Sequence, residues 1–81
     1  MMARYYFNLH ECGTVTSDPE GREFASLAAA RDAAKEDARA IMCEELGTGC
    51  LCLSCRIEIT DGEGRCLDLV LFKDAVDVVG A

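Results

Sequence analysis

The chain has 81 residues, 51% of them apolar, with one proline and a net charge of −7 at neutral pH. This length and composition indicate one ordered domain and exclude both two independent domains and a disordered chain. The negative charge is spread along the whole sequence, which disfavours binding to nucleic-acid phosphates and to anionic membranes. The apolar runs are too short for a signal peptide or a membrane span, so we expect a cytoplasmic protein with reduced cysteines.

Two short strands are predicted near the N-terminus. Polar and apolar residues alternate over 4–10, the period-two pattern of a strand with one buried face. The β-branched residues of 14–17 predict a second strand, which returns after a turn. Pro and Gly in the Asp-Pro-Glu-Gly sequence at 18–21 suit a tight turn, and residues 22–24 can briefly resume the strand.

One long helix is predicted over residues 26–46. Ser26 suits the N-cap, and no Gly or Pro interrupts the Ala-rich and Leu-rich segment that follows it. Gly47 suits the position just after the last helical residue. Apolar residues recur at three- and four-residue spacing and form one stripe, which consists of Leu27, Ala30, Ala34, Ala38, Ile41, Met42 and Leu46.

A C-terminal hairpin is predicted from strands at 51–60 and 66–72. Alternation in both strands favours burial of Leu51, Leu53, Cys55, Ile57 and Ile59 in the first and of Leu67, Leu69 and Leu71 in the second. A three-residue loop over 62–64 suits the sequence, because Gly64 can adopt the left-handed conformation that such loops require. This loop predicts the cross-strand pairs Ile59–Leu67, Ile57–Leu69 and Cys55–Leu71.

The predicted order is β-β-α-β-β. We therefore expect an α+β fold in which residues 1–81 form a single small domain, with one antiparallel sheet and one long helix packed on one face. The pattern over 73–81 fits either another short strand or a turn of helix.

Several motifs are spread over nearly the whole chain. They are Arg-Tyr-Tyr-Phe-Asn-Leu at 4–9, Asp-Pro-Glu-Gly at 18–21, Arg-Ile-Glu-Ile-Thr-Asp at 56–61 and Phe-Lys-Asp-Ala-Val at 72–76, together with the Ala-rich helix. This combination resembles a family of small bacterial domains of unknown function, frequent in rhizobia and related genera. The resemblance implies a compact cytosolic domain of bacterial origin and brings no activity, cofactor or catalytic residue. The cysteines within 50–55 lie outside the motifs of that family.

Three of the six cysteines lie within residues 50–55, a density that invites a metal site. In a regular strand Cys50 and Cys52 point to one side and Cys55 to the other, so the three sulfurs converge only if the strand begins later. If the preceding loop is irregular, Cys43 can join Cys50 and Cys52 in a zinc or thiol site. The competing interpretation is that cysteine serves here as a small apolar residue.

The sequence offers little support for catalysis. Cys43 lies near the end of the helix, where the dipole disfavours a thiolate, and Cys55 is predicted to be buried. Cys12, two residues after His10, is the remaining candidate for a reactive thiol. The acidic residues lack the spacing of a calcium loop, and no phosphate-binding glycine loop is present. We therefore predict no enzymatic activity and no cofactor.

A second apolar face is the feature that bears most on function. Tyr6, Val70 and Phe72 lie opposite the residues predicted to face the helix, where a sheet covered on one side normally shows polar residues. An exposed apolar patch marks an interaction surface, whereas a tail that folds back after Phe72 would cover it. We predict a protein-interaction module that forms a homodimer through the face or edge of its sheet. A third interpretation, an antitoxin-like regulator, rests on architecture alone.

Overall fold

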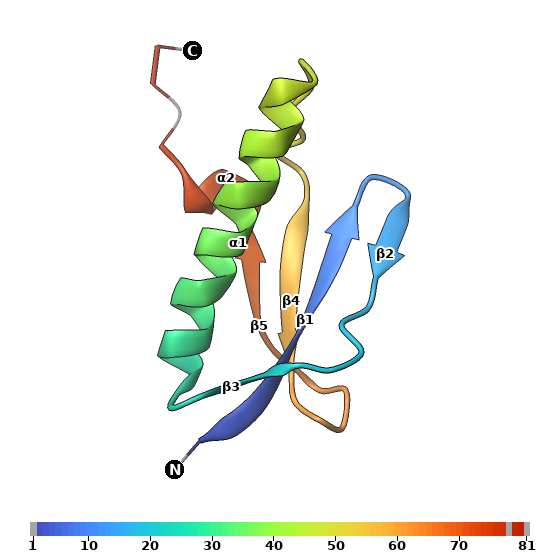
Figure 1. Ribbon diagram of the computed structural model, residues 1–81, viewed down its shortest axis with the longest axis vertical. Coiled ribbons are helices and arrows are strands. Elements are labelled where there is room, and N and C mark those ends of the chain that lie inside the picture. Colours follow the sequence, from blue (N-terminus) through green and yellow to red (C-terminus); the bar gives the residue numbers. More distant parts are fainter. Residues whose placement is uncertain (1, 78, 81) are drawn as a thin grey trace.

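The structure, a computed structural model, describes residues 2–77 and 79–80 (Figure 1). It confirms the α+β fold with strands and one long helix in the predicted order, and the brief strand over 22–24 is present as well. The helix expected over 26–46 is present, and part of 73–81 takes the helical alternative. The elements are β1 (Ala3–Glu11), β2 (Thr14–Thr16), β3 (Arg22–Phe24), α1 (Leu27–Gly47), β4 (Arg56–Thr60), β5 (Cys66–Leu71) and α2 (Phe72–Ala75).

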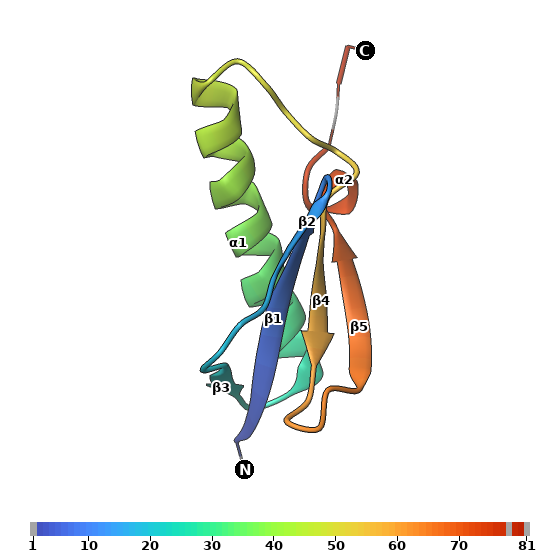
Figure 2. The same ribbon diagram turned by 90° about the vertical axis from the view of Figure 1, so that its right-hand side faces the viewer.

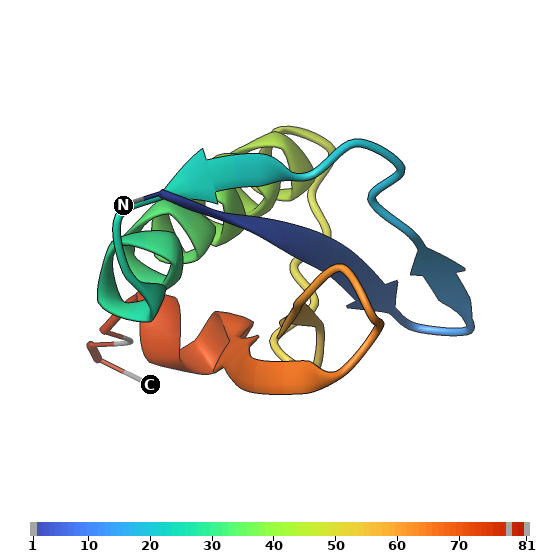
Figure 3. The ribbon, with the colours of Figure 1, turned by 90° about the horizontal axis from the view of Figure 1, so that it is seen from below.

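The sheet is antiparallel and its strands lie in the order β2-β1-β4-β5. The long strand β1 also pairs with β3 through its first residues, Ala3, Arg4 and Tyr5. Figure 2 shows α1 along one face of this sheet, and Figure 3 shows β3 beside the start of β1, on the side where α1 lies. A single helix therefore covers one face of the sheet, as the sequence predicted.

The core lies between α1 and the sheet. Every fourth residue of the helix faces inward, which buries Ala30, Ala34, Ala38 and Met42. The hydroxyl of Ser26 accepts a hydrogen bond from the backbone N–H of Ala29 at 3.1 Å, which confirms the predicted N-cap. The other buried apolar residues come from the strands, the loop before β4 and α2, namely Cys55, Ile57, Ile59, Val70, Phe72 and Ala75.

The loop between β4 and β5 has the predicted length. The backbone N–H of Asp61 donates to the carbonyl of Arg65 at 3.1 Å, and Gly64 is left-handed with φ of 83°. Thr60 pairs with Cys66, but the next pair is Ile59 with Asp68, so the residue between them on β5 is an extra one. This β-bulge at Leu67 shifts the rest of the hairpin by one residue.

Because of the bulge, the residues of β5 beyond it that were predicted to point outward point toward the helix, and those predicted to point inward lie on the outer face. Ile57 faces Val70 instead of Leu69, so the predicted cross-strand pairs of this hairpin are wrong beyond the loop. Val70 and Phe72 are 2% and 0% exposed and belong to the core, whereas Leu67 and Leu69 are 40% and 45% exposed. The apolar patch predicted from Tyr6, Val70 and Phe72 therefore does not form on the surface, since two of its members are buried and Tyr6 is half-buried.

An ion pair favours the shifted register of β5. The unshifted register places Asp68 on the outer face beside Glu58, which is a repulsive pair. In the shifted register Asp68 faces the helix, and Arg31 donates to its carboxylate at 2.5 Å. The hydrogen bond from Arg31 and the positive charge of that side chain hold the pKa of Asp68 below its usual range, against the opposing effect of burial. A contact between helix and sheet therefore stabilises the register in which Asp68 is inward.

Hydrogen bonds of Asp18 connect the turn between β2 and β3 to the middle of β1. Its carboxylate accepts hydrogen bonds from the backbone N–H groups of Phe7 at 3.1 Å, Glu20 at 3.2 Å and Gly21 at 3.0 Å. Its own backbone N–H donates to the side-chain oxygen of Asn8 at 3.0 Å. Burial raises the pKa of Asp18, but the three backbone donors outweigh that effect and the net pKa lies below the usual value.

Candidate metal centre

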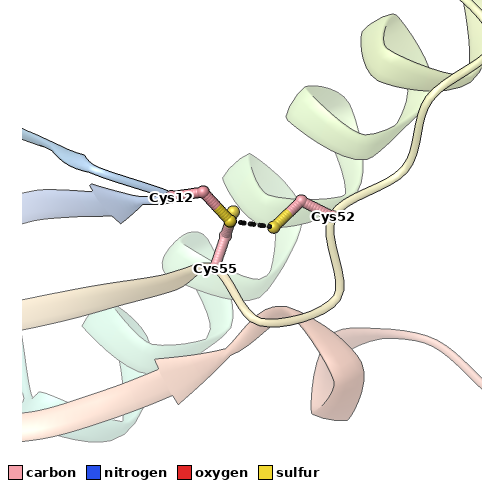
Figure 4. Close-up of side chains that lie close together, drawn as sticks. All are labelled: Cys12, Cys52 and Cys55. Atoms are coloured by element: carbon pink, nitrogen blue, oxygen red, sulfur yellow. Dashed lines mark hydrogen bonds between the residues drawn. The ribbon is translucent and has the colours of Figure 1, made fainter.

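Three cysteine sulfurs converge at one end of the sheet. Cys12 lies in the turn between β1 and β2, and Cys52 and Cys55 lie in the loop between α1 and β4 (Figure 4). Their Sγ atoms all lie within 4.8 Å of one another, and those of Cys12 and Cys52 are 3.1 Å apart. We call these three residues the thiol cluster.

The segment that contains Cys52 and Cys55 forms a loop and not a strand, because its backbone is hydrogen-bonded to the end of the helix. The backbone N–H of Cys50 donates to the carbonyl of Glu45 at 3.2 Å, and that of Cys52 donates to Oε2 of the Glu45 side chain at 3.2 Å. Gly49, with φ of 85°, provides the left-handed residue for the change of direction. The first strand of the hairpin therefore begins at Arg56 and not at residue 51 as predicted.

The cysteines that converge in the structure are not the set that the sequence offered as a zinc or thiol site. Cys43 and Cys50 are exposed and lie outside the thiol cluster, so they do not join Cys52 as expected. The late start of β4 meets the condition under which Cys52 and Cys55 can converge, and Cys55 is buried as predicted. The missing partner is Cys12, which the sequence singled out only as a possible reactive thiol.

Two signals could have identified the thiol cluster from sequence. Cys52-Leu53-Ser54-Cys55 is a single C-x-x-C motif, a spacing that brings two sulfurs together in a loop. The pairing of β1 with β4 sets His10 opposite Arg56, and the same register two residues further along places Cys12 beside Ser54. That second signal depends on knowing that these two strands are neighbours.

The hydrogen bonds within the thiol cluster shift the pKa values of its thiols. Those from Cys55, Ser54 and Cys12, in that order of importance, lower the pKa of the Cys52 thiol to about 6. Burial, followed by the hydrogen bond to Cys52 and by the negative charge there, raises the pKa of Cys55 to about 12. The hydroxyl of Ser54 lies 3.2 Å from the sulfur of Cys52 and 3.5 Å from that of Cys12. The two pKa values are shifted in opposite directions, so Cys52 loses its proton more readily than Cys55.

The ring nitrogens of His10, two residues before Cys12, contact side chains of β4. Its Nε2 atom lies 3.3 Å from a carboxylate oxygen of Glu58, and its Nδ1 atom lies 3.5 Å from the guanidinium of Arg56. These contacts keep the imidazole among the charged side chains of the outer sheet face.

The thiol cluster has the donor type and spacing of a soft-metal site. A zinc ion bound at about 2.3 Å from each sulfur requires sulfurs about 4 Å apart. The sulfurs lie within 4.8 Å of one another, so small side-chain rotations would bring them to that separation. Cys12 is exposed, which gives an ion a route from solvent. The arrangement can therefore supply three thiolate ligands to one ion.

Comparison with known proteins places the chain within one family. A family model described as a domain of unknown function (DUF6894) matches residues 4–73, a segment that includes the whole thiol cluster and the sheet from Arg4 onward. No curated protein and no solved structure matches the chain. Within residues 2–77 and 79–80, no helix is both long enough and apolar enough to cross a membrane.

Proposed function

Because the chain belongs to the DUF6894 family of domains of unknown function, we propose its role from its own residues: the domain binds one zinc ion through the sulfurs of Cys12, Cys52 and Cys55. The observation that carries this proposal is the convergence of three sulfurs from two segments whose cysteines are 40 residues apart. Thiolates are preferred zinc ligands, and a site assembled from distant segments links binding to the folded state.

Three protein ligands leave the fourth position of a tetrahedral ion free for water or for a donor from a partner. Closed structural zinc sites usually have four protein ligands, so this site is an open one. Glu45 lies outside this set of donors, and its Oε1 atom is buried without a hydrogen-bond partner among the described residues. The other oxygen of this carboxylate accepts from the backbone N–H of Cys52.

Zinc and cobalt titrations of the reduced 81-residue chain test this proposal. We expect one equivalent of metal to bind, with the near-ultraviolet absorption of thiolate-to-Co²⁺ charge transfer. Cys12→Ser should weaken binding by about 100-fold or more, since loss of a ligand exceeds the roughly 10- to 100-fold effect of residues that only orient ligands.

Cys43→Ser and Cys50→Ser are the matched controls, because both cysteines are exposed and neither belongs to the thiol cluster. Both variants should bind metal like the unmodified protein. Less than one equivalent of metal in the unmodified protein, or equal losses in Cys12→Ser and Cys50→Ser, would contradict the proposed site.

A homodimer through β5 is a second proposal, and the orientation of this strand favours it. β5 is an edge strand, and it exposes Leu67 at the bulge and Leu69 on the face opposite the helix. Leu53 and Leu71 extend this apolar surface and line a shallow hollow beside it. An unpaired apolar edge can pair with the same edge of a second copy. This role is non-enzymatic, and the net charge of −7 favours a protein partner over nucleic acid.

Sedimentation at high micromolar concentration tests the homodimer. We expect a dimer for the unmodified protein and a monomer for Leu69→Glu, whose charge would be buried in the interface. Thr14→Glu, at an exposed position on the opposite edge strand, is the control and should remain dimeric. A monomeric unmodified protein would exclude the proposed dimer.

A further inference from the structure

The three sulfurs of the thiol cluster differ in their access to solvent. Cys12 is exposed and Cys52 is partly exposed, whereas Cys55 is only 2% exposed. The two accessible sulfurs are also a close pair, 3.1 Å apart. We propose that a low-molecular-weight disulfide, such as oxidised glutathione, converts Cys12 and Cys52 to an intramolecular disulfide while Cys55 stays reduced. This activity requires no bound metal and does not depend on the proposed zinc site.

The local backbone permits this bond. A disulfide requires its sulfurs to approach to about 2.05 Å, roughly 1 Å closer than the two thiols now lie. Cys12 lies in a turn and Cys52 in a loop without regular structure, so neither a helix nor a strand has to move. Cys55 directly precedes β4, and its carbonyl accepts the backbone N–H of Phe72 at 3.0 Å. The C-x-x-C pair of Cys52 and Cys55 is therefore the less adaptable and less accessible alternative.

The reaction is a thiol–disulfide exchange in two steps. The thiolate of Cys52, between the thiol of Cys12 at 3.1 Å and the hydroxyl of Ser54 at 3.2 Å, attacks one sulfur of the external disulfide. A bond forms from Cys52 to that sulfur, and the other sulfur leaves as a thiolate. Cys12 then loses its proton to water and attacks the sulfur of Cys52, which releases the second external thiolate. Two protein thiols are oxidised, and one external disulfide is reduced to two thiols.

Cys12 and Cys52 differ from the remaining exposed cysteines because each has a neighbouring thiol. Cys43, Cys50 and Cys66 are exposed but belong to no cluster in the described part of the chain. An external disulfide can modify each of them, but without a neighbouring thiol to resolve the adduct the modification remains a mixed disulfide. The distinguishing product of the thiol cluster is therefore a protein disulfide without a bound external group.

The test uses the 81-residue chain carrying Cys43→Ser, Cys50→Ser and Cys66→Ser, which leaves only the thiol cluster to react. The reduced protein is freed of metal with a chelator, treated with oxidised glutathione, and mapped by mass spectrometry after alkylation in acid. We expect a peptide pair joined through Cys12 and Cys52, an alkylated Cys55, and two released glutathione molecules for each protein disulfide.

Cys12→Ser in the same chain removes the resolving thiol, and we expect glutathione to remain attached to Cys52. This substitution is at an exposed turn, and circular dichroism of the variant verifies that it folds. A disulfide between Cys52 and Cys55, or glutathione that stays on Cys52 when Cys12 is present, would overturn the proposal. Since metal is absent throughout, either result leaves the zinc proposal to its own titration.

Discussion

Replacing Phe72 with alanine is expected to lower the free energy of unfolding by about 3 to 5 kcal/mol, the usual effect of truncating a buried phenylalanine. Phe72 is fully buried, and it begins α2, which closes the core beside α1. Small domains are stable by only about 5 to 15 kcal/mol, so the variant should be close to unfolding at 25 °C. Urea denaturation followed by circular dichroism measures the difference.

Leu69→Ala is the matched control for Phe72→Ala. Leu69 lies on the outer face of β5 and is among the most exposed leucines, so at a protein concentration at which the chain is monomeric its truncation should cost less than about 1 kcal/mol. The two substitutions together test the bulge at Leu67, because the unshifted register would bury Leu69 and expose Phe72. A larger loss from Leu69→Ala than from Phe72→Ala would show that the hairpin lacks the bulge.

Asp18→Ala is expected to lower the free energy of unfolding by about 3 kcal/mol at pH 7. The substitution leaves three backbone N–H groups without their charged acceptor, among them the N–H of Phe7 in the middle of β1. Hydrogen bonds to charged groups contribute about 1.5 to 3 kcal/mol each. Glu20 is more exposed than the other two residues, so a water molecule can take the place of the carboxylate at its backbone N–H and reduce the loss of stability. Thermal or urea unfolding at pH 7 measures the change.

Asp18→Asn supplies the control for charge, because it keeps an acceptor oxygen of the same size. The folded protein holds the pKa of Asp18 below the value of 3.8 in an unfolded chain. The carboxylate therefore contributes stability that is fully present above pH 3.8 and is lost as the pH falls through the folded pKa. The stability difference between the unmodified protein and Asp18→Asn should shrink over this window. A difference that stays constant with pH would show that the charge of Asp18 has no part in the turn.

The elements that depend on local chemistry could be predicted from the sequence. The N-cap at Ser26, the alanine stripe of the helix and the left-handed Gly64 each follow from a few neighbouring residues. The inward face of β5 could not be predicted, because apolar residues occupy both of its faces. One interaction that favours the observed face is made by Arg31, which is 37 residues from Asp68 in the chain and pairs with it only after helix and sheet have met.

The thiol cluster was only partly predictable for the same reason. Alternating apolar residues in 50–55 look like a strand, and the contacts of Glu45 that hold this segment as a loop do not show in its periodicity. Cys52 was identified as a candidate ligand, but its partners were not. Cys12 joins it because β1 lies beside β4, a neighbour relation that no local pattern of residues contains.

The distance along the chain between Cys12 and Cys52 links occupancy of the thiol cluster to folding. In an unfolded chain Cys12 is no longer held beside Cys52 and Cys55, so an ion bound by these three sulfurs favours the folded state. A ligand that binds only the folded state and is present at 100 times its dissociation constant adds about 2.7 kcal/mol to stability. Small domains have a free energy of unfolding of only about 5 to 15 kcal/mol, so this contribution is a substantial share of it. The amount of folded protein in a cell would then follow the supply of the ion.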